Sequence, residues 1–456
     1  MEYHELYRRY AGKLLLRSEI LVDDSFFEQL LKDGYLTPKP SIKKTWGHYK
    51  CQRCGNQKPS LFGTLPCYNC KRTHVYCRKC IDMGRVMECL SLYEWTGDSL
   101  GWASYSNACS WSGNLTPPQQ EASDRIIQAI KQREKELLVW AVCGAGKTEM
   151  LYPGISEALR IKKRVCIATP RADVVRELLP RLRAAFSGVY IQGLYGGSLE
   201  KDGTAQLIIT TTHQLLRYSN AFDVMIIDEV DAFPYTKDPT LPFSSERAKS
   251  KDSTTIYLTA TPRKEYKRKI NQKKLPFIFV PRRFHNQPLP VPAFRMCFSL
   301  KKDLADYRPP ESFYKWFAQR TNRNRQVLIF VPTIRLADNM TQRLAARLAR
   351  YKIKAVHAAD ENREEKVQAF RDKQYQLLVT TTILERGVTF PSVDVAVLDA
   401  GHNVFDEAAL VQIAGRAGRS PDDPDGEVVF FHDGKTEAMV EAAKSIIKMN
   451  RRGGFR

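Results

Sequence analysis

Short apolar runs alternate with amphipathic stretches along most of this 456-residue chain. Between residues 115 and 285, the predicted strands are LLVWAVC, RVCIATP, QLIITTT, DVMIIDEVD and STTIYLTATP. Continuously apolar runs of this kind are typical of strands buried on both faces of a parallel sheet. Between them, ADVVRELLPRLRAAF has apolar residues at helical spacing. This region is therefore predicted to be an α/β domain.

The alternation resumes after FHNQPLPVPAF, a segment at residues 284–294 whose three prolines favour an extended linker. Here the predicted strands are QVLIFVPT, IKAVHA, YQLLVTTT, DVAVLDAG and GEVVFFHD, with helices over ADNMTQRLAARLARY and EEKVQAFRD. Strands alternating with helices imply right-handed βαβ crossovers. We therefore expect two tandem α/β domains. The predicted boundaries are 1–114 for an N-terminal module, 115–285 and 301–445 for the domains, 286–300 for the linker and 446–456 for a basic tail.

Residues 1–114 lack this periodicity and hold eight of the eleven cysteines. Six of them form Cys-x-x-Cys pairs, namely Cys51 with Cys54, Cys67 with Cys70, and Cys77 with Cys80. Each such turn presents two thiolates to one ion, and two turns complete a tetrahedron around Zn²⁺. Redox catalysis is the alternative for a single pair, but three pairs in a turn-rich region disfavour it. The N-terminal region is therefore predicted to be a structural zinc module.

The number of zinc ions stays open. Six thiolates exceed one tetrahedral site, and two complete sites need eight ligands. Cys89, Cys109, His48 or His74 would have to contribute to a second site. One ion with two spare cysteines is the smaller assumption, and the sequence does not decide which two pairs bind it.

The charge balance favours a polyanionic partner. The chain has 71 basic and 50 acidic residues, a net charge of +21. Neutralised phosphates release condensed counterions, so nucleic acid is the first expectation. An anionic membrane surface is the competitor, yet no lysine-rich amphipathic helix stands out. Apolar runs stay far below the ~20 residues that cross a bilayer, and the N-terminus resembles no secretory signal. We expect a cytoplasmic protein in a reducing compartment, where disulfides are disfavoured.

A phosphate-binding loop is predicted at AVCGAGKTEM, which follows an apolar run and precedes a helical pattern. Gly144, Ala145 and Gly146 would bring backbone N–H groups close to the phosphates of ATP. Lys147 would meet the β- and γ-phosphates, and the Thr148 hydroxyl would coordinate Mg²⁺. The alternative is a plain glycine turn at a helix start.

The segment VMIIDEVDAF supports the nucleotide interpretation, because its strand delivers two adjacent carboxylates at its C-terminal end. Open α/β sheets bind ligands at that edge. Asp228 would hold the metal, and Glu229 would polarise the attacking water.

These segments resemble the superfamily 2 helicases. LTPPQ, ATPRADVV, TTHQLL, DEVD, LTATP, IFVPT, TTTILERGVTF and QIAGRAGRS occur in the family's order over about residues 115–435. The resemblance implies two RecA-like domains that close on ATP. It also implies nucleotide contacts from Gln119, Gly387, Gln412, Arg416 and Arg419. Thr259 and Thr261 would couple hydrolysis to movement, and Arg419 would be the finger on the γ-phosphate.

The same resemblance implies a track for a nucleic-acid strand. Small hydroxyl and glycine positions at strand ends suit phosphate oxygens without reading bases. The predicted contacts are Thr169, Arg171, Gly197, Thr211, His213 and Thr381. Each of them alone could equally be a turn or a helix cap. The basic run at residues 263–274 fits a solvated helix as well as a nucleic-acid contact.

A multi-cysteine region ahead of a DEVD-type motor, with YCRKCIDMGRV after its first knuckles, resembles the ComFA family. These are late-competence DNA-uptake ATPases of naturally transformable Gram-positive bacteria. The resemblance implies single-stranded DNA as substrate, and ComFC and the membrane DNA channel as partners. It places the protein in the cytoplasm at the inner face of the membrane, and leaves a homo-oligomer open.

Three alternatives remain at this point. PriA, the replication-restart helicase, also pairs cysteine knuckles with such a motor, but inserts them among its later helicase segments. An RNA helicase is a further option, because the motifs cannot show a preference for the 2′-hydroxyl. The third is a zinc-bearing DNA scaffold with a degenerate nucleotide pocket, against which Lys147, Glu229 and Arg419 argue.

Overall fold

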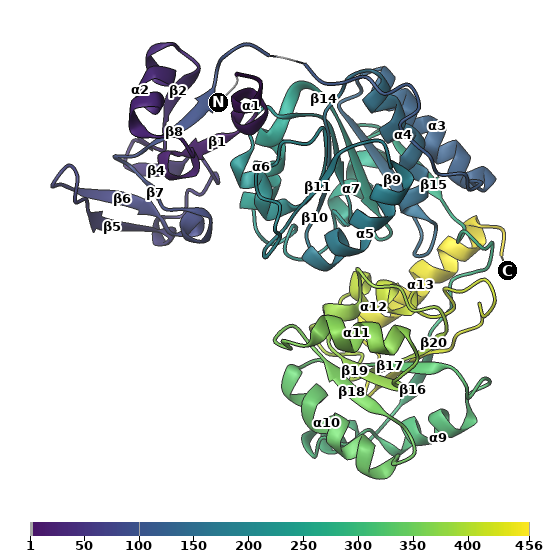
Figure 1. Cartoon of the computed structure of the whole chain (residues 1–456). Coiled ribbons are helices and arrows are strands. Elements are labelled where there is room, and N and C mark those ends of the chain that lie inside the picture. Colours follow the sequence, from purple (N-terminus) through teal and green to yellow (C-terminus); the bar gives the residue numbers. More distant parts are fainter. Residues whose placement is uncertain (1–2, 100, 456) are drawn as a thin grey trace. The chain divides into compact units, whose positions relative to one another are not determined.

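The computed structural model describes residues 3–99 and 101–455 (Figure 1). The chain divides into two compact units. The first comprises the chain up to Val139 together with Thr148–Ile278, and the second comprises Trp140–Lys147 and the chain from Phe279 onward. Among the described residues, no helix is both long and apolar enough to cross a membrane.

The first unit is built around a seven-stranded sheet of order β11-β12-β10-β13-β14-β9-β15. Its strands are β9 (Glu136–Ala141), β10 (Val165–Thr169), β11 (Ile191–Leu194), β12 (Leu207–Thr211), β13 (Phe222–Ile227), β14 (Lys249–Thr259) and β15 (Phe277–Val280). The register is parallel where β10 meets β12 and β13, where β11 meets β12, and where β13 meets β14. The five predicted strands are present, and β11 and β15 are additional.

Helices connect these strands, as the alternating pattern predicts. They are α3 (Pro117–Lys131), α4 (Lys147–Arg160), α5 (Ala172–Ala185), α6 (Thr240–Ala248) and α7 (Lys264–Asn271). Helix α5 packs on β10, β11 and β12, and α3 and α6 contact β14. The basic run at 263–274 forms α7, which has no buried residue.

The N-terminal module contains small sheets that the sequence pattern did not predict. One sheet has the antiparallel order β1-β8-β2, beside a β3-β4 hairpin and a sheet β5-β6-β7. The elements are α1 (Tyr3–Tyr10), β1 (Leu14–Leu16), α2 (Asp24–Lys32), β2 (Leu36–Pro40), β3 (Ile42–Thr45), β4 (His48–Cys51), β5 (Phe62–Pro66), β6 (Thr73–Cys77), β7 (Val86–Met87) and β8 (Ser91–Trp95). A core that includes Leu6, Tyr10, Phe27 and Trp95 joins the helices to the first sheet.

This module packs against the α/β domain of its own unit. Leu216, in the 3-10 helix η4 (Thr212–Arg217), joins the apolar cluster that contains Leu16 and Val86 of the module. Arg247 donates from Nη1 to the carbonyl oxygen of Gln52 at 3.0 Å and from Nη2 to that of Leu216 at 2.6 Å. The module is therefore a fixed part of the first unit.

The second unit holds a parallel six-stranded sheet of order β16-β21-β20-β17-β19-β18. The strands are β16 (Ala293–Met296), β17 (Gln326–Phe330), β18 (Ile353–Val356), β19 (Leu377–Thr380), β20 (Val393–Leu398) and β21 (Val428–His432). The helices are α8 (Leu300–Ala305), α9 (Glu311–Gln319), α10 (Ile334–Arg347), α11 (Arg363–Arg371), α12 (Glu407–Ala414) and α13 (Glu437–Arg452).

Two sequence predictions in this unit need correction. The predicted linker, 286–300, contains β16, whose Ala293 pairs in register with Val429 of β21. Prolines next to it are tolerated because β16 is an edge strand, which has one unpaired side. The predicted tail, 446–456, is helical as far as Arg452, the last residue of α13. The Arg452 guanidinium lies 3.7 Å from the ring centroid of Phe279, so this end of the helix is anchored.

Candidate functional site

Segments predicted to act on a nucleotide follow three adjacent strands, β13, β14 and β9. Asp228 comes directly after β13, Thr259 ends β14, and the glycine loop comes directly after β9. The main chain holds Asp228 in place, because its N–H donates to the carbonyl of Ala168 at 2.8 Å. Its Oδ1 accepts from the backbone N–H of Glu229 at 2.9 Å.

Glu229 has the features of a residue held for function. Its φ is +56°, in the left-handed region that a glutamate seldom adopts. Its Oε2 is buried and has no hydrogen-bond partner among the described residues. Leaving a buried polar group unpaired costs about 1–3 kcal/mol. A carboxylate kept in this state is suited to accept a hydrogen bond from a water held at the same strand end.

Asp231 joins the end of β13 to the end of β14. Thr259 Oγ1 donates to its Oδ1 and Thr261 Oγ1 donates to its Oδ2, both at 2.6 Å. The N–H of Thr261 also donates to Thr259 Oγ1 at 3.0 Å. Both predicted coupling threonines are therefore fixed by one buried carboxylate. Asp231 is the last residue of the DEVD segment, and nothing in the local sequence indicates this bridging role.

The glycine loop, residues 142–146, belongs to the second unit by its contacts. Gly144 and Gly146 have φ of +79° and +71°, where a side chain would be strained. A Cβ on Gly144 would also lie 3.2 Å from Nε of Arg283. Helix α4 begins at Lys147, and the N-terminus of a helix with its free N–H groups favours phosphate. The loop therefore fits a nucleotide phosphate.

Within the second unit, the QIAGRAGRS segment contacts this loop. The Cys143 thiol donates to Gln412 Oε1 at 3.2 Å. Arg283 lies inside the predicted first domain and belongs to none of the helicase-like motifs, yet it donates from Nη2 to the carbonyl of Ala417 at 2.7 Å. Burial lowers the pKa of Arg283 to about 10. These contacts hold the loop and the segment together.

The two predicted nucleotide-facing arginines make backbone contacts of their own. Arg416 is buried, and its Nε donates to the carbonyl of Glu385 at 3.0 Å. Arg419 donates from Nε to the carbonyl of Gly415 at 3.0 Å. Gln119, which is also predicted to contact the nucleotide, is buried, and its Oε1 accepts from Thr116 N at 2.8 Å in a capping box. The roles of these three residues on ATP stay predictions.

The predicted strand contacts lie at the ends of β10, β12, β11 and β19. The first three strands are neighbours in the sheet of the first unit, and β19 lies in the second. Thr169, Thr211 and Thr381 are buried, whereas Gly197 and His213 are exposed and Arg171 is half-buried. Three of the segments thus share one sheet edge. Contact with nucleic acid stays a prediction for all six residues.

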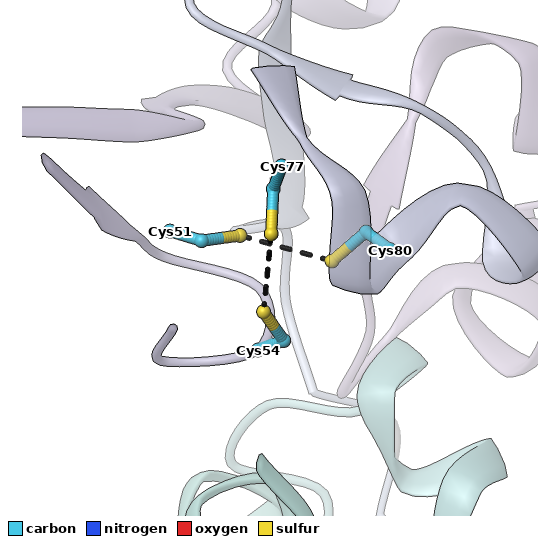
Figure 2. A group of neighbouring side chains, drawn as sticks. All are labelled: Cys51, Cys54, Cys77 and Cys80. Carbon is cyan, nitrogen blue, oxygen red and sulfur yellow. Dashed lines mark hydrogen bonds between the residues drawn. The ribbon is translucent and has the colours of Figure 1, made fainter. Parts of the chain in front are cut away.

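Four of the candidate metal ligands, Cys51, Cys54, Cys77 and Cys80, form a buried cluster (Figure 2). Cys51 Sγ lies 3.7 Å from Cys80 Sγ, and Cys54 Sγ lies 3.5 Å from Cys77 Sγ. A tetrahedral ion with Zn–S bonds of ~2.3 Å would space its sulfurs by about 3.8 Å. The donor set and its spacing therefore fit a structural zinc ion with no open position.

Cys67 and Cys70 lie elsewhere, in a group with Cys89. Cys89 has no Cys-x-x-Cys partner, so the spacing of the cysteines indicates it only as one of several possible ligands of a second metal ion. Outside the module, Cys143, Cys166 and Cys297 are buried single thiols. Burial raises the pKa of Cys166, which is typical of an inert core cysteine.

Family models match three successive parts of the chain. They are the competence protein ComFA N-terminal domain at residues 2–94, the type III restriction enzyme res subunit at 112–264 and the helicase conserved C-terminal domain at 310–421. Two relatives match nearly the whole chain. Competence protein ComFA of Bacillus subtilis strain 168 is 47% identical over 98% of this chain and 95% of its own length. Competence protein ComFA of Streptococcus pneumoniae R6 is 35% identical over 98% of this chain and 99% of its own length.

Solved helicase structures share the fold. S. cerevisiae Dbp5 bound to RNA and ADP BeF3 aligns with a TM-score of 0.54 at 18% identity, covering 74% of this chain and 92% of Dbp5. Mycobacterium smegmatis helicase Lhr bound to ssDNA and AMP-PNP aligns with a TM-score of 0.54 at 19% identity, covering 75% of this chain and 51% of Lhr. Both parallel sheets are therefore those of RecA-like helicase domains. The chain belongs to the ComFA family of competence proteins and carries the helicase-type motor of a DNA-dependent ATPase.

Proposed function

We propose that this protein is an ATP-driven translocase of single-stranded DNA that draws transforming DNA into the cell during natural competence. The observation that carries the proposal is Glu229, beside Asp228 at the end of β13, with its strained backbone and a buried carboxylate oxygen that has no partner in the described part of the chain. A protein that only binds DNA has no use for such a residue. Relatives of nearly full length that are named competence proteins supply the biological setting.

In this proposal each part of the ATP site has one task. Backbone N–H groups of Gly144–Gly146 and the ammonium of Lys147 hold the phosphates. Thr148 and Asp228 hold Mg²⁺, which neutralises phosphate charge when bound. Glu229 orients the attacking water and takes its proton. Arg416 and Arg419 of QIAGRAGRS stabilise the charge that develops on the γ-phosphate, together with Gln412, while Gln119 and Gly387 contact the rest of the nucleotide.

The thiol cluster of Cys51, Cys54, Cys77 and Cys80 holds a zinc ion that ties the β3-β4 hairpin to β6. Four thiolates leave that ion no position for a substrate, so its contribution is to folding. We place the protein in the cytoplasm at the inner face of the membrane. Its proposed partners are ComFC and the membrane DNA channel, and self-association is part of the same proposal.

The test measures phosphate release by purified full-length protein against single-stranded DNA, duplex DNA and RNA at stated salt. We expect single-stranded DNA to stimulate release most. Glu229→Gln and Lys147→Ala should each lower the stimulated rate at least about 100-fold. Glu246→Gln is the matched control, because that glutamate is exposed and forms its ion pair with Lys249, away from the phosphate-binding loop. Stimulated turnover that survives both site variants contradicts the assignment.

Translocation is measured separately, as ATP-dependent displacement of streptavidin from the end of a biotinylated single strand. Displacement without opening of a forked duplex supports the translocase. Efficient duplex opening favours the PriA-like helicase instead, and stimulation by RNA above DNA favours an RNA helicase. A DNA affinity that does not change when nucleotide is added, together with no phosphate release, favours the scaffold.

A further inference from the structure

We propose that Cys67, Cys70, His74 and Cys89 form a second metal site, a Cys₃His zinc site separate from the buried four-cysteine cluster. The three thiol sulfurs all lie within 4.8 Å of one another. Cys70 Sγ also lies 3.0 Å from Nε2 of His74. The three sulfurs therefore converge on one point, and the imidazole nitrogen beside Cys70 is the candidate for the fourth position. Cys₃His is a common donor set of structural zinc sites.

The backbone around Cys67 repeats the backbone around Cys51. In the buried cluster, Gly55 N donates to the Cys51 carbonyl at 2.9 Å, and Gly55 has a φ of +72°. In the second group, Lys71 N donates to the Cys67 carbonyl at 3.0 Å, and Lys71 has a φ of +55°. In both turns the N–H of the first cysteine donates to the carbonyl five residues on, at 3.0 and 2.8 Å respectively.

The strain at Lys71 supports the same inference. A left-handed conformation costs a residue with a side chain roughly 1–2 kcal/mol, a cost that glycine avoids. Here the turn keeps that conformation with a lysine. Both turns therefore have the knuckle geometry that points two thiols at one ion, although only the first carries the usual glycine.

His74 is oriented by a carboxylate. Its Nδ1 lies 3.8 Å from Oε2 of Glu88, while its Nε2 faces Cys70. Metal-binding histidines commonly direct their second ring nitrogen to a carboxylate, which fixes the tautomer that leaves the other nitrogen for the ion. Glu88 is positioned by its own main chain, because its N–H donates to the carbonyl of Val75 at 2.8 Å. The same contact places Cys89, the next residue, beside strand β6.

The second site differs from the first in exposure. Cys70 is exposed, whereas all four cysteines of the first cluster are buried. A chelator can therefore reach the second ion without opening the module. The ion would tie the β5-β6 hairpin loop to the turn after β7. It would thereby fix the loop that presents Tyr68, which is 86% exposed.

Zinc content of the reduced full-length protein, purified with ZnCl₂ and measured by mass spectrometry, tests the site. We expect two zinc ions per chain. Cys70→Ser and Cys89→Ser should each leave one, with unchanged circular dichroism and ATP turnover. Cys109→Ser is the matched control, because Cys109 belongs to neither group, and it should retain two. One ion in the wild-type protein, with no loss in Cys89→Ser, overturns the proposal.

The fourth ligand is tested by release kinetics with a chromophoric chelator. The wild-type protein should release one ion in a fast phase and one in a slow phase. Cys89→Ser should lack the fast phase, and His74→Ala should accelerate it at least about tenfold. A fast phase that His74→Ala leaves unchanged refutes the Cys₃His assignment. Absorption of the Co²⁺-loaded protein gives a second readout, since Cys89→Ser should remove the thiolate-to-cobalt bands of one of two sites.

Discussion

Replacing Arg53 by methionine is expected to lower the free energy of opening of the N-terminal module by about 3 kcal/mol. The Arg53 side chain has no exposed surface, and its Nη2 donates to both carboxylate oxygens of Glu19 at 2.7 and 2.9 Å. Its Nη1 donates to the carbonyl of Met83 at 2.8 Å. Removing one partner of a buried ion pair costs about 3–5 kcal/mol. The lower figure applies because Arg217 Nε stays on Glu19 at 3.1 Å.

Hydrogen exchange measured by mass spectrometry reports this loss of opening free energy in peptides that cover residues 48–62 and 74–90. A change of 3 kcal/mol corresponds to exchange about 100-fold faster in these peptides. Lys39→Met is the control, because its ion pair with Glu94 is 3.7 Å long and 47% and 27% exposed. Such pairs contribute about 0–1 kcal/mol. If Arg53→Met speeds exchange no more than Lys39→Met does, the buried arginine does not hold the module together.

Two further predictions address the motor and its pH response. Asp231→Asn should lower DNA-stimulated phosphate release about 10- to 100-fold, because Thr259 and Thr261 lose a charged acceptor. The KM for ATP should change by no more than about twofold. Unchanged stimulation would show that this network is dispensable. Burial lowers the pKa of Lys13 to about 7, far below its value in an unfolded chain, so the unfolded state binds more protons between pH 7 and about 10. The free energy of unfolding, measured in urea, should therefore rise with pH across that window more steeply in the wild-type protein than in Lys13→Met. The difference between the two slopes should reach up to about 1.4 kcal/mol per pH unit. Equal slopes would contradict the burial argument.

The two α/β domains were predictable because their strands are buried on both faces and their helices are amphipathic. Strand β11 could not be predicted from an apolar run, for a physical reason. Its sequence IQGL holds a glycine and the buried Gln192, so it does not form an apolar run. The Gln192 side chain is satisfied inside the protein, where its Oε1 accepts from Ala205 N at 2.8 Å. A hydrogen bond made by distant residues cannot be seen in a local pattern.

The cysteine module was predictable in its chemistry but not in its pairing. A Cys-x-x-Cys turn is a local structure, so the sequence shows each pair of ligands. Which pairs share an ion depends on how the strands meet. Strands β5 and β6 pair with Phe62 opposite Cys77. This register places the Cys77 and Cys80 pair at the end of the hairpin away from the Cys67 and Cys70 pair. Cys89 joins its group through the turn after β7, with no neighbouring cysteine to mark it.

Contacts between the module and the motor suggest why a thiol-rich region precedes an ATPase. The buried cysteines share an apolar cluster with Leu216, and Arg53 and Arg247 both donate to the carbonyl of Leu216, at 3.4 and 2.6 Å. Leu216 lies in η4, which directly follows β12 and includes His213, one of the predicted strand contacts. An ion that fixes the cysteines therefore also fixes a surface on which the motor is proposed to hold DNA. Because a rigid support transmits a conformational change to a bound strand better than a mobile one, we propose that an ion in this cluster strengthens the contact of the motor with DNA.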